Sequence, residues 1–181
     1  MIDVEITSAD ALWAWLEQNH ATDTSVRLIT WKAATPEKYV SREDVLDALL
    51  AYGWIDGRRF TVDDHRTAQL ITPRKQQAWS QSYKDRVARL RTEGRMQPAG
   101  EAAVTAGKAS GLWDFFADVD ALIVPDDLDQ AINRPKWDAL APSYRRNVLR
   151  WIKLAKRPAT RQKRIAAASD ATAKGKKLPQ M

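Results

Sequence analysis

Residues 41–60 read SREDVLDALLAYGWIDGRRF, and this stretch decides the class of fold. Ser41, with Asp44 three residues later, is typical of a helix N-terminus, where a side-chain oxygen accepts a hydrogen bond from a backbone N–H that has no partner within the helix. The apolar residues that follow lie at helical spacing: Val45, Leu46, Leu49 and Leu50. Gly53 is predicted to end the helix, because glycine readily takes the left-handed conformation that closes one. A strand is expected directly afterwards, over residues 54–60.

Two further strands are expected around this stretch. Residues 25–32 alternate between the two faces of a strand, and residues 67–72 follow 54–60 after a polar turn, so this pair is predicted to form a hairpin. Residues beyond Trp79 carry helical spacing. We therefore predict an α+β fold, in which a small, mostly antiparallel sheet of about three strands packs with helices and a C-terminal helical module follows. The expected division is an α+β body over 1–117 and a basic helical module over 118–181, together one compact unit.

The charge of the chain is unevenly distributed. The 181 residues carry a net charge of +6. Residues 134–181 hold 14 Lys and Arg residues against Asp138 and Asp170, so this segment carries +12 and the remainder −6. Residues 144–156 are predicted to form a helix whose apolar stripe is opposed by four basic side chains: Arg146, Arg150, Lys153 and Arg157. This basic face is a candidate site for nucleic acid or another anion, and it also fits a solvated helix surface.

The sequence lacks the residues that several classes of function require. The chain has no cysteine and only two histidines, which excludes disulfides and thiolate chemistry and leaves little for a histidine-based metal site. No nucleotide-binding glycine loop, zinc-protease helix or hydrolase nucleophile elbow is present. We therefore expect a binding protein rather than an enzyme, with no metal and no cofactor. No run of eighteen apolar residues occurs and the first ten residues are acidic, so a cytoplasmic protein without a membrane span is expected.

Three tryptophans stand beside polar residues in the predicted strands and loops. Trp31 precedes Lys32, Trp54 lies two residues before Asp56, and Trp79 follows the segment that contains Arg74. If the sheet pairs as predicted, these segments converge on one edge, where aromatic and charged side chains suit an anionic or planar ligand. The candidate ligand-binding residues are Trp31, Lys32, Trp54, Asp56, Arg58, Arg74, Lys75, Trp79 and Ser80. The alternative is structural: an ion pair between Arg74 and Asp56 that fixes the hairpin between buried tryptophans.

The sequence also resembles a known family. The motifs that carry the resemblance run from Trp15 to Lys177: Trp15-Leu16 with His20, Trp31-Lys32, the box from Tyr52 to Gly57, Thr72-Pro73-Arg74-Lys75, Trp79-Ser80, Gly94-Arg95-Met96, and the tail from Ser143 through Ala155-Lys156-Arg157-Pro158 to Ile165. On these motifs the chain resembles the bacteriocin-protection, YdeI/OmpD-associated family over nearly its whole length, and the tail resembles that family's small C-terminal helical module. The resemblance implies tolerance of bacteriocins or cationic antimicrobial peptides and assigns no catalytic residues.

These observations leave three hypotheses open. The first is a non-enzymatic cytoplasmic stress-tolerance protein, similar to bacteriocin- or cationic-peptide-protection proteins, that binds a small anionic or planar ligand, or a peptide, in the tryptophan–arginine cleft. The second is a nucleic-acid-binding protein that uses the basic C-terminal helices. The third is an enzyme of unknown reaction. The sequence does not indicate an oligomeric state.

Overall fold

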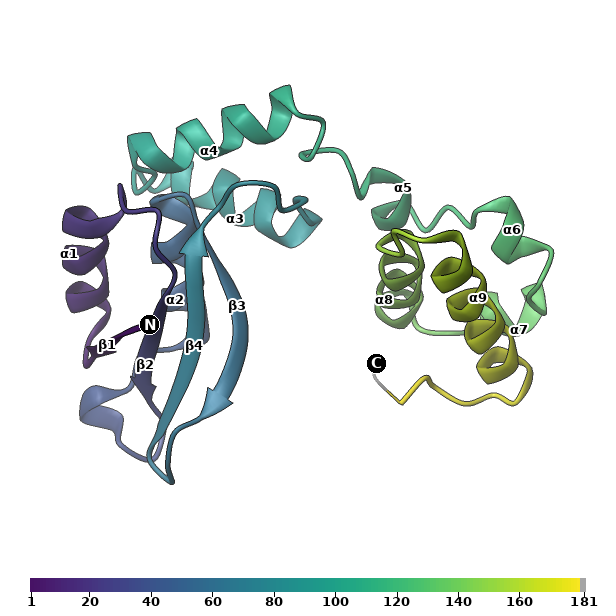
Figure 1. The fold of residues 1–181 in the computed structure, drawn as a ribbon, viewed down its shortest axis with the longest axis horizontal. Coiled ribbons are helices and arrows are strands. Elements are labelled where there is room, and N and C mark those ends of the chain that lie inside the picture. Colours follow the sequence, from purple (N-terminus) through teal and green to yellow (C-terminus); the bar gives the residue numbers. More distant parts are fainter. Residues whose placement is uncertain (180–181) are drawn as a thin grey trace. The chain divides into compact units, whose positions relative to one another are not determined.

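The computed structural model describes residues 1–179, and the chain divides into two compact units, Met1–Asp114 and Phe115–Met181. The elements of the first unit are β1 (Ile2–Ile6), α1 (Ala9–Asn19), β2 (Val26–Trp31), the 3-10 helix η1 (Pro36–Lys38), α2 (Arg42–Ala51), β3 (Trp54–Thr61), β4 (Arg66–Pro73), α3 (Gln81–Thr92) and α4 (Pro98–Ala109). Those of the second unit are α5 (Ala117–Asp120), α6 (Asp126–Asp129), α7 (Arg134–Asp138), α8 (Pro142–Lys153) and α9 (Pro158–Ala173) (Figure 1). The predicted α+β class and the helical C-terminal region are confirmed.

The sheet has four strands in the order β1-β2-β4-β3, and it is mixed. β2 and β3 both pair antiparallel to β4, which confirms the predicted hairpin of β3 and β4. The sheet has one strand more than the approximately three expected, because β1 adds to its edge parallel to β2. Its two acidic residues, Asp3 and Glu5, do not prevent this, since they bond Arg27 and Arg66 on other strands of the sheet while Ile6 enters the core.

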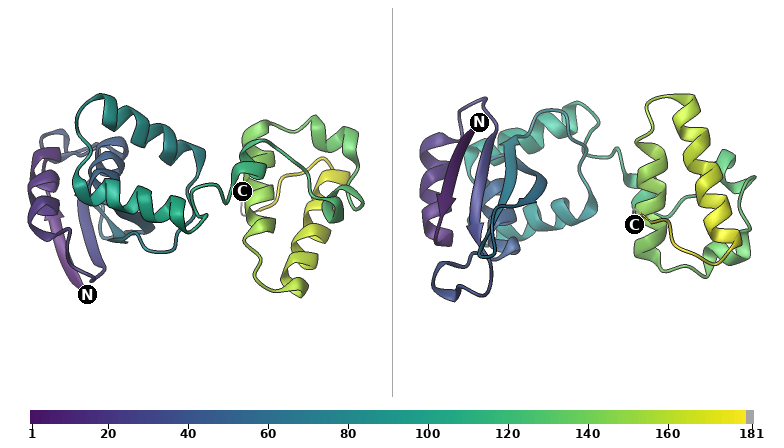
Figure 2. Two further views of the ribbon diagram at one scale, coloured as in Figure 1. Left: turned by 90° about the horizontal axis from the view of Figure 1, so that it is seen from above. Right: turned by 60° about the horizontal axis from the view of Figure 1, so that its bottom comes forward.

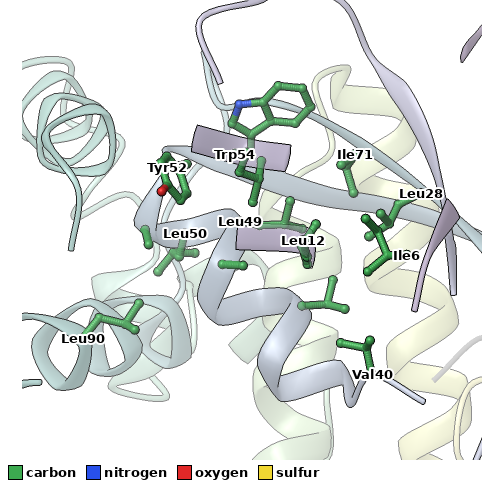
Figure 3. Close-up of a cluster of buried hydrophobic side chains, with 14 of the residues drawn as sticks. Ile6, Leu12, Leu28, Val40, Leu49, Leu50, Tyr52, Trp54, Ile71 and Leu90 are labelled. Atoms are coloured by element: carbon green, nitrogen blue, oxygen red, sulfur yellow. The ribbon is translucent and has the colours of Figure 1, made fainter. Parts of the chain in front are cut away.

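Helices α1 and α2 supply the core on one face of this sheet. Val45 and Leu49 of α2 and Leu12 of α1 belong to one buried cluster with Leu28 and Ile71 from the strands (Figure 3). Leu28 pairs with Gln69, which lies two residues before Ile71 on β4. The register therefore places the side chains of Leu28 and Ile71 on the same side of the sheet. The other face of β2 and β4 carries no helix of the first unit (Figure 1).

The ends of α2 are built as the sequence predicts. Ser41 Oγ accepts a hydrogen bond from the Asp44 backbone N–H at 3.1 Å. Gly53 follows the helix with φ +73°, and a Cβ there would lie 2.8 Å from the Ala99 carbonyl oxygen of α4. Glycine is therefore required at this position for two reasons, the left-handed backbone and the close approach of α4.

Helices α3 and α4 both pack against α2. Asp47 of α2 is buried and accepts hydrogen bonds from Arg86 and Arg89 of α3, with the Arg89 contact at 2.6 Å. Gly100 lets α4 approach the C-terminal end of α2, because a Cβ at this position would overlap the Ala51 carbonyl oxygen. These contacts fix α3 and α4 against α2.

The second unit is helical over its described part, and α8 and α9 lie side by side in it (Figure 2). Tyr144, Val148 and Ile152 of α8 are buried, as the predicted apolar stripe requires. Leu149 is buried as well, although it lies outside that stripe, because α5 packs on the side of α8 that carries Arg150 and Lys153. Within residues 1–179, no helix is both long and apolar enough to span a membrane.

Candidate functional site

The three tryptophans of the predicted cleft do not wall a common cavity. Trp54 is 0% exposed and donates from Nε1 to the His20 carbonyl oxygen at 3.2 Å, within the core cluster (Figure 3). Trp79 is 1% exposed and packs against Trp113, with ring centroids 5.0 Å apart. The Trp31 indole donates to Glu5 at 3.1 Å and is covered by Lys38 Nζ, 4.3 Å from the ring centroid. Each ring is therefore already in contact with other side chains. The positions of these three rings do not support stacking on a planar ligand.

Arg74, Trp79 and Asp56 are nevertheless brought together, through a residue that was not among the predicted site residues. The Arg74 guanidinium lies 3.9 Å from the Trp79 ring centroid and 5.0 Å from that of Tyr83. The Tyr83 hydroxyl donates a hydrogen bond to Asp56 Oδ1, so the tyrosine bonds the carboxylate that the structural alternative paired with Arg74. Burial, together with this bond to Asp56, raises the pKa of Tyr83 above its ordinary value. The helical stripe of Tyr83, Val87 and Leu90 identifies Tyr83 only as a core residue, so no signal in the sequence pointed to this contact.

Arg74 itself is a partly desolvated cation. Its Nη1 donates to the Gln77 carbonyl oxygen at 3.0 Å, whereas its Nε and Nη2 are buried and have no hydrogen-bond partner within residues 1–179. Burial lowers the pKa of Arg74 to about 10, although the nearby Tyr83 and Asp56 act in the opposite direction. The guanidinium still carries its charge at neutral pH, and it contributes positive electrostatic potential at the nearby Asp56 carboxylate.

The remaining predicted residues lie apart from this group. Lys32 Nζ donates to the Asp63 carbonyl oxygen at 2.9 Å. Arg58 is exposed, with its guanidinium 5.1 Å from the Phe60 ring. Lys75 pairs with Asp23 at 3.0 Å in solvent, and Ser80 is buried before the start of α3.

A β-bulge places two charged residues of β3 on the same face of the sheet. Asp56 pairs with Ile71 and Arg59 pairs with Gln69, so two residues of β3, Gly57 and Arg58, oppose one residue of β4. Strict alternation would put positions 56 and 59 on opposite faces. With the bulge, the buried Gln69 side chain contacts both of them: its Nε2 donates to Asp56 Oδ2 at 3.2 Å, and its Oε1 accepts from Arg59 Nη2 at 3.1 Å.

Two hollows meet at Arg42 and Arg59, and we call them together the Arg42–Arg59 groove. The first, of about 310 Å³, is lined by Arg42, Asp56, Gly57, Arg59 and Gln69. The second, of about 230 Å³, shares Arg42 and Arg59 and extends along the ends of β2 and β4: Thr30, Trp31, Lys32, Ala33, Tyr39, Val40, Val45 and Thr67. Trp31, Lys32 and Asp56 are the predicted site residues that take part in this groove.

The groove is positively charged because its arginines are not neutralised by carboxylates. Most arginines of the first unit form salt bridges: Arg27, Arg66, Arg86, Arg89, Arg91 and Arg95. Within residues 1–179, the arginines of this unit that form none are Arg42, Arg58, Arg59 and Arg74, all grouped around Asp56 in sequence or space. Asp56 is the single carboxylate in the described walls, and it already accepts from Tyr83 and Gln69. Such an arrangement favours an anion.

The basic residues predicted on α8 are partly engaged within the second unit. Lys153 pairs with Asp118 at 2.5 Å, and Arg150 lies 3.9 Å from Asp120, both on α5. Arg146 and Arg157 form no salt bridge within residues 1–179, and Arg157 is exposed at the start of α9. No group of three His, Asp or Glu side chains that could hold a metal ion is found in this part of the chain.

Comparisons with known proteins divide the chain at the same region as the structure. Residues 4–103 match the family model "Domain of unknown function (DUF8412)", and because this match spans more than half of the sequence, the chain belongs to that family. Residues 121–175 match the model "Bacteriocin-protection, YdeI or OmpD-Associated". The resemblance stated from the sequence is thus confirmed for the C-terminal part, whereas the box from Tyr52 to Gly57 falls in the first match. Neither the curated proteins nor the solved structures provide a match.

Proposed function

We propose that this member of the DUF8412 family is a non-enzymatic cytoplasmic binding protein with a bacteriocin-protection-like role, whose first unit binds a small anionic ligand in the Arg42–Arg59 groove. The match over residues 121–175 suggests the role. The observation that carries the ligand is the pair of arginines that lines a hollow without a carboxylate partner. A guanidinium offers a planar fork of N–H donors, which suits a carboxylate or a phosphate.

The groove is prepared for such a ligand by the residues around the arginines. Arg59 is held by Gln69 through one Nη2 bond, which leaves its other donors free within residues 1–179. Asp56 accepts hydrogen bonds from Tyr83 and Gln69, and within residues 1–179 it forms no salt bridge with Arg59. An incoming anion therefore replaces water rather than a protein carboxylate at Arg59, and it does not have to break an existing ion pair.

Charge argues against direct capture of a cationic peptide in this groove. Residues 1–114 hold 15 Lys and Arg against 16 Asp and Glu, whereas residues 115–181 carry a net +7. Two of the four arginines of this nearly neutral unit that form no salt bridge within residues 1–179, Arg42 and Arg59, line the groove, and the second unit repels polycations. We therefore propose that any protection against such peptides is indirect and operates through the anionic ligand.

Isothermal titration calorimetry with pyrophosphate and with citrate, at low ionic strength, tests the proposal. Arg42→Gln and Arg59→Gln should each weaken binding at least about tenfold, in line with a lost charge-assisted hydrogen bond. Arg58→Gln is the matched control, since Arg58 neighbours the groove, forms no salt bridge within the described residues and does not line either hollow. Equal losses in all three variants, or no binding of either anion, would contradict the proposal.

Nucleic-acid binding by α8 is the alternative, and the geometry supports it less. Two of its four predicted contacts, Arg150 and Lys153, face the carboxylates of α5. A titration with duplex DNA at low salt would favour this alternative if binding were tight and were lost in Arg146→Gln.

A further inference from the structure

The second unit contains a hollow of its own, unrelated to the Arg42–Arg59 groove. Its volume is about 150 Å³, and it lies where α5, the loop before α6, α8 and α9 meet. Val119, Leu149 and Ile152 form an apolar lining, and all three are buried. A cavity of this volume holds a molecule as large as benzene, so the apolar part of the lining suits a compact apolar group of about six heavy atoms.

Two cations, Lys153 and Arg161, and one carboxylate, Asp118, also line this hollow, and both cations have N–H donors beyond those that bond aspartates. Lys153 Nζ bonds Asp118 at 2.5 Å and has three N–H donors, so one bond leaves two. Arg161 bonds Asp127 through Nε at 2.6 Å and Nη2 at 2.7 Å, and its Nη1 donates to no protein atom within residues 1–179. The acidic partners hold the two cations in place, and the remaining donors are available to an anionic group.

The chain that follows α5 forms one side of the hollow. Leu122 adopts φ +58°, and the Ile123 N–H bonds the Asp118 carbonyl oxygen at 2.9 Å, as in a helix C-cap of the Schellman type. This turn ends α5 and presents Ile123, which lines the hollow yet is 60% exposed. An exposed apolar side chain at the edge of an apolar cavity is a natural contact for an apolar ligand.

We infer that this hollow binds a small carboxylate with a compact apolar body. The apolar part lies against Leu149, Ile152 and Val119, and the carboxylate accepts hydrogen bonds from Lys153 and Arg161. Two sources share this chemistry: a free short branched or aromatic acid, and the C-terminal carboxylate of a peptide that ends in an apolar residue. Most residues that line the hollow lie in the family match over residues 121–175, but Asp118 and Val119 of α5 precede it.

Titration of the full-length ¹⁵N-labelled protein, followed by heteronuclear NMR, tests the inference. Isovalerate and benzoate should give saturable shifts at the amides of residues 118–124 and 149–153. Isovaleramide and benzamide, which have the same shape without the charge, should bind at least about tenfold more weakly, as expected for the loss of a charge-assisted hydrogen bond. Lys153→Gln and Arg161→Gln should weaken the acids to a similar degree, while Lys156→Gln, an exposed residue outside the hollow, should not.

The possible results separate the inference from its rivals. Amides that bind as well as acids, acid binding that survives both variants, or the absence of saturable shifts would each overturn it. Tighter binding of N-acetyl-leucine than of isovalerate assigns the site to a peptide C-terminus, and the reverse assigns it to a free acid. Arg42→Gln should leave all of these titrations unchanged, so the result does not depend on the groove of the first unit.

Discussion

Asp47 provides the sharpest test of how the first unit holds its helices together. Its side chain is 6% exposed, and it accepts hydrogen bonds from Arg86 and Arg89, with Arg95 Nη1 at 3.7 Å. Asp47→Asn preserves the shape and one acceptor oxygen but removes the charge that these cations share. We expect the variant to lower the free energy of unfolding substantially at pH 7.

The magnitude follows from what each cation retains. Removing one partner of a buried ion pair costs about 3–5 kcal/mol. Arg86 keeps Glu43 as a partner, and Arg89 is exposed enough to be hydrated, so the loss should lie near the lower end, at about 3 kcal/mol. Glu43→Gln is the matched control, because Glu43 bonds the same Arg86 but is 71% exposed, and such a pair is worth at most about 1 kcal/mol.

The effect should depend on pH in a defined direction. Burial acts to raise the pKa of Asp47, but the hydrogen bonds and charges of Arg89 and Arg86 together outweigh it and hold the pKa below the ordinary 3.8. A carboxyl group whose pKa is lower in the folded state stabilises the fold above the unfolded pKa and loses this contribution as the pH falls through the folded pKa. The difference between the native protein and Asp47→Asn should therefore be full at pH 7 and shrink below about pH 3.8.

Urea denaturation followed by tryptophan fluorescence measures this difference at several pH values. The reasoning would be refuted if Glu43→Gln cost as much as Asp47→Asn, or if the difference were the same at pH 7 and well below the folded pKa. The first result would mean that burial adds nothing to the ion pairs of Asp47, and the second that the Asp47 charge does not stabilise the fold.

Three further changes test packing and backbone conformation. Gly100→Ala should destabilise the first unit by about 2 kcal/mol, since overlap with the Ala51 carbonyl outweighs the roughly 1 kcal/mol that alanine gains in a helix; a neutral result in urea denaturation would show that α4 can move away. Leu122→Gly should be more stable than Leu122→Ala by about 1 kcal/mol, because only glycine takes a φ of +58° without strain, and equal melting temperatures would disprove this. Arg74→Ala should cost about 2–3 kcal/mol through lost packing on Trp79, as thermal unfolding would measure, whereas wild-type stability would favour a ligand role for Arg74.

Part of the candidate site can be anticipated from residues that are close in sequence. Asp56 and Lys32 stand out by their place beside tryptophans, and both line the Arg42–Arg59 groove. Arg42 and Arg59, which give the groove its positive charge, do not stand out in the sequence. Arg42 has the pattern of an ordinary helix residue, and Arg59 is one of two adjacent charged residues on a predicted strand. Nothing in a single sequence marks an arginine as lacking a carboxylate partner, since that partner can come from any distant segment.

Local signals determined most of the elements of the chain, although not β1. The Ser41 cap, the apolar spacing of α2 and the left-handed Gly53 depend on contacts within a few residues, so the sequence alone predicts them. The same holds for the hairpin of β3 and β4 and for the basic character of the C-terminal region. Composition likewise excludes thiol chemistry, because a chain without cysteine cannot supply it in any fold.

Long-range pairing decided the rest. The bulge that turns Asp56 and Arg59 to one face depends on the register against β4, and one residue of slip reverses every side chain beyond it. The bond from Tyr83 to Asp56 joins residues 27 apart, and Lys153 pairs with a carboxylate of α5 that lies 35 residues away. Distant segments decide whether a tryptophan lines a cleft or is buried in the core. They also decide whether an arginine has a carboxylate partner. That outcome is set by the packing of the whole unit, because burial and charge pairing are properties of neighbours in space.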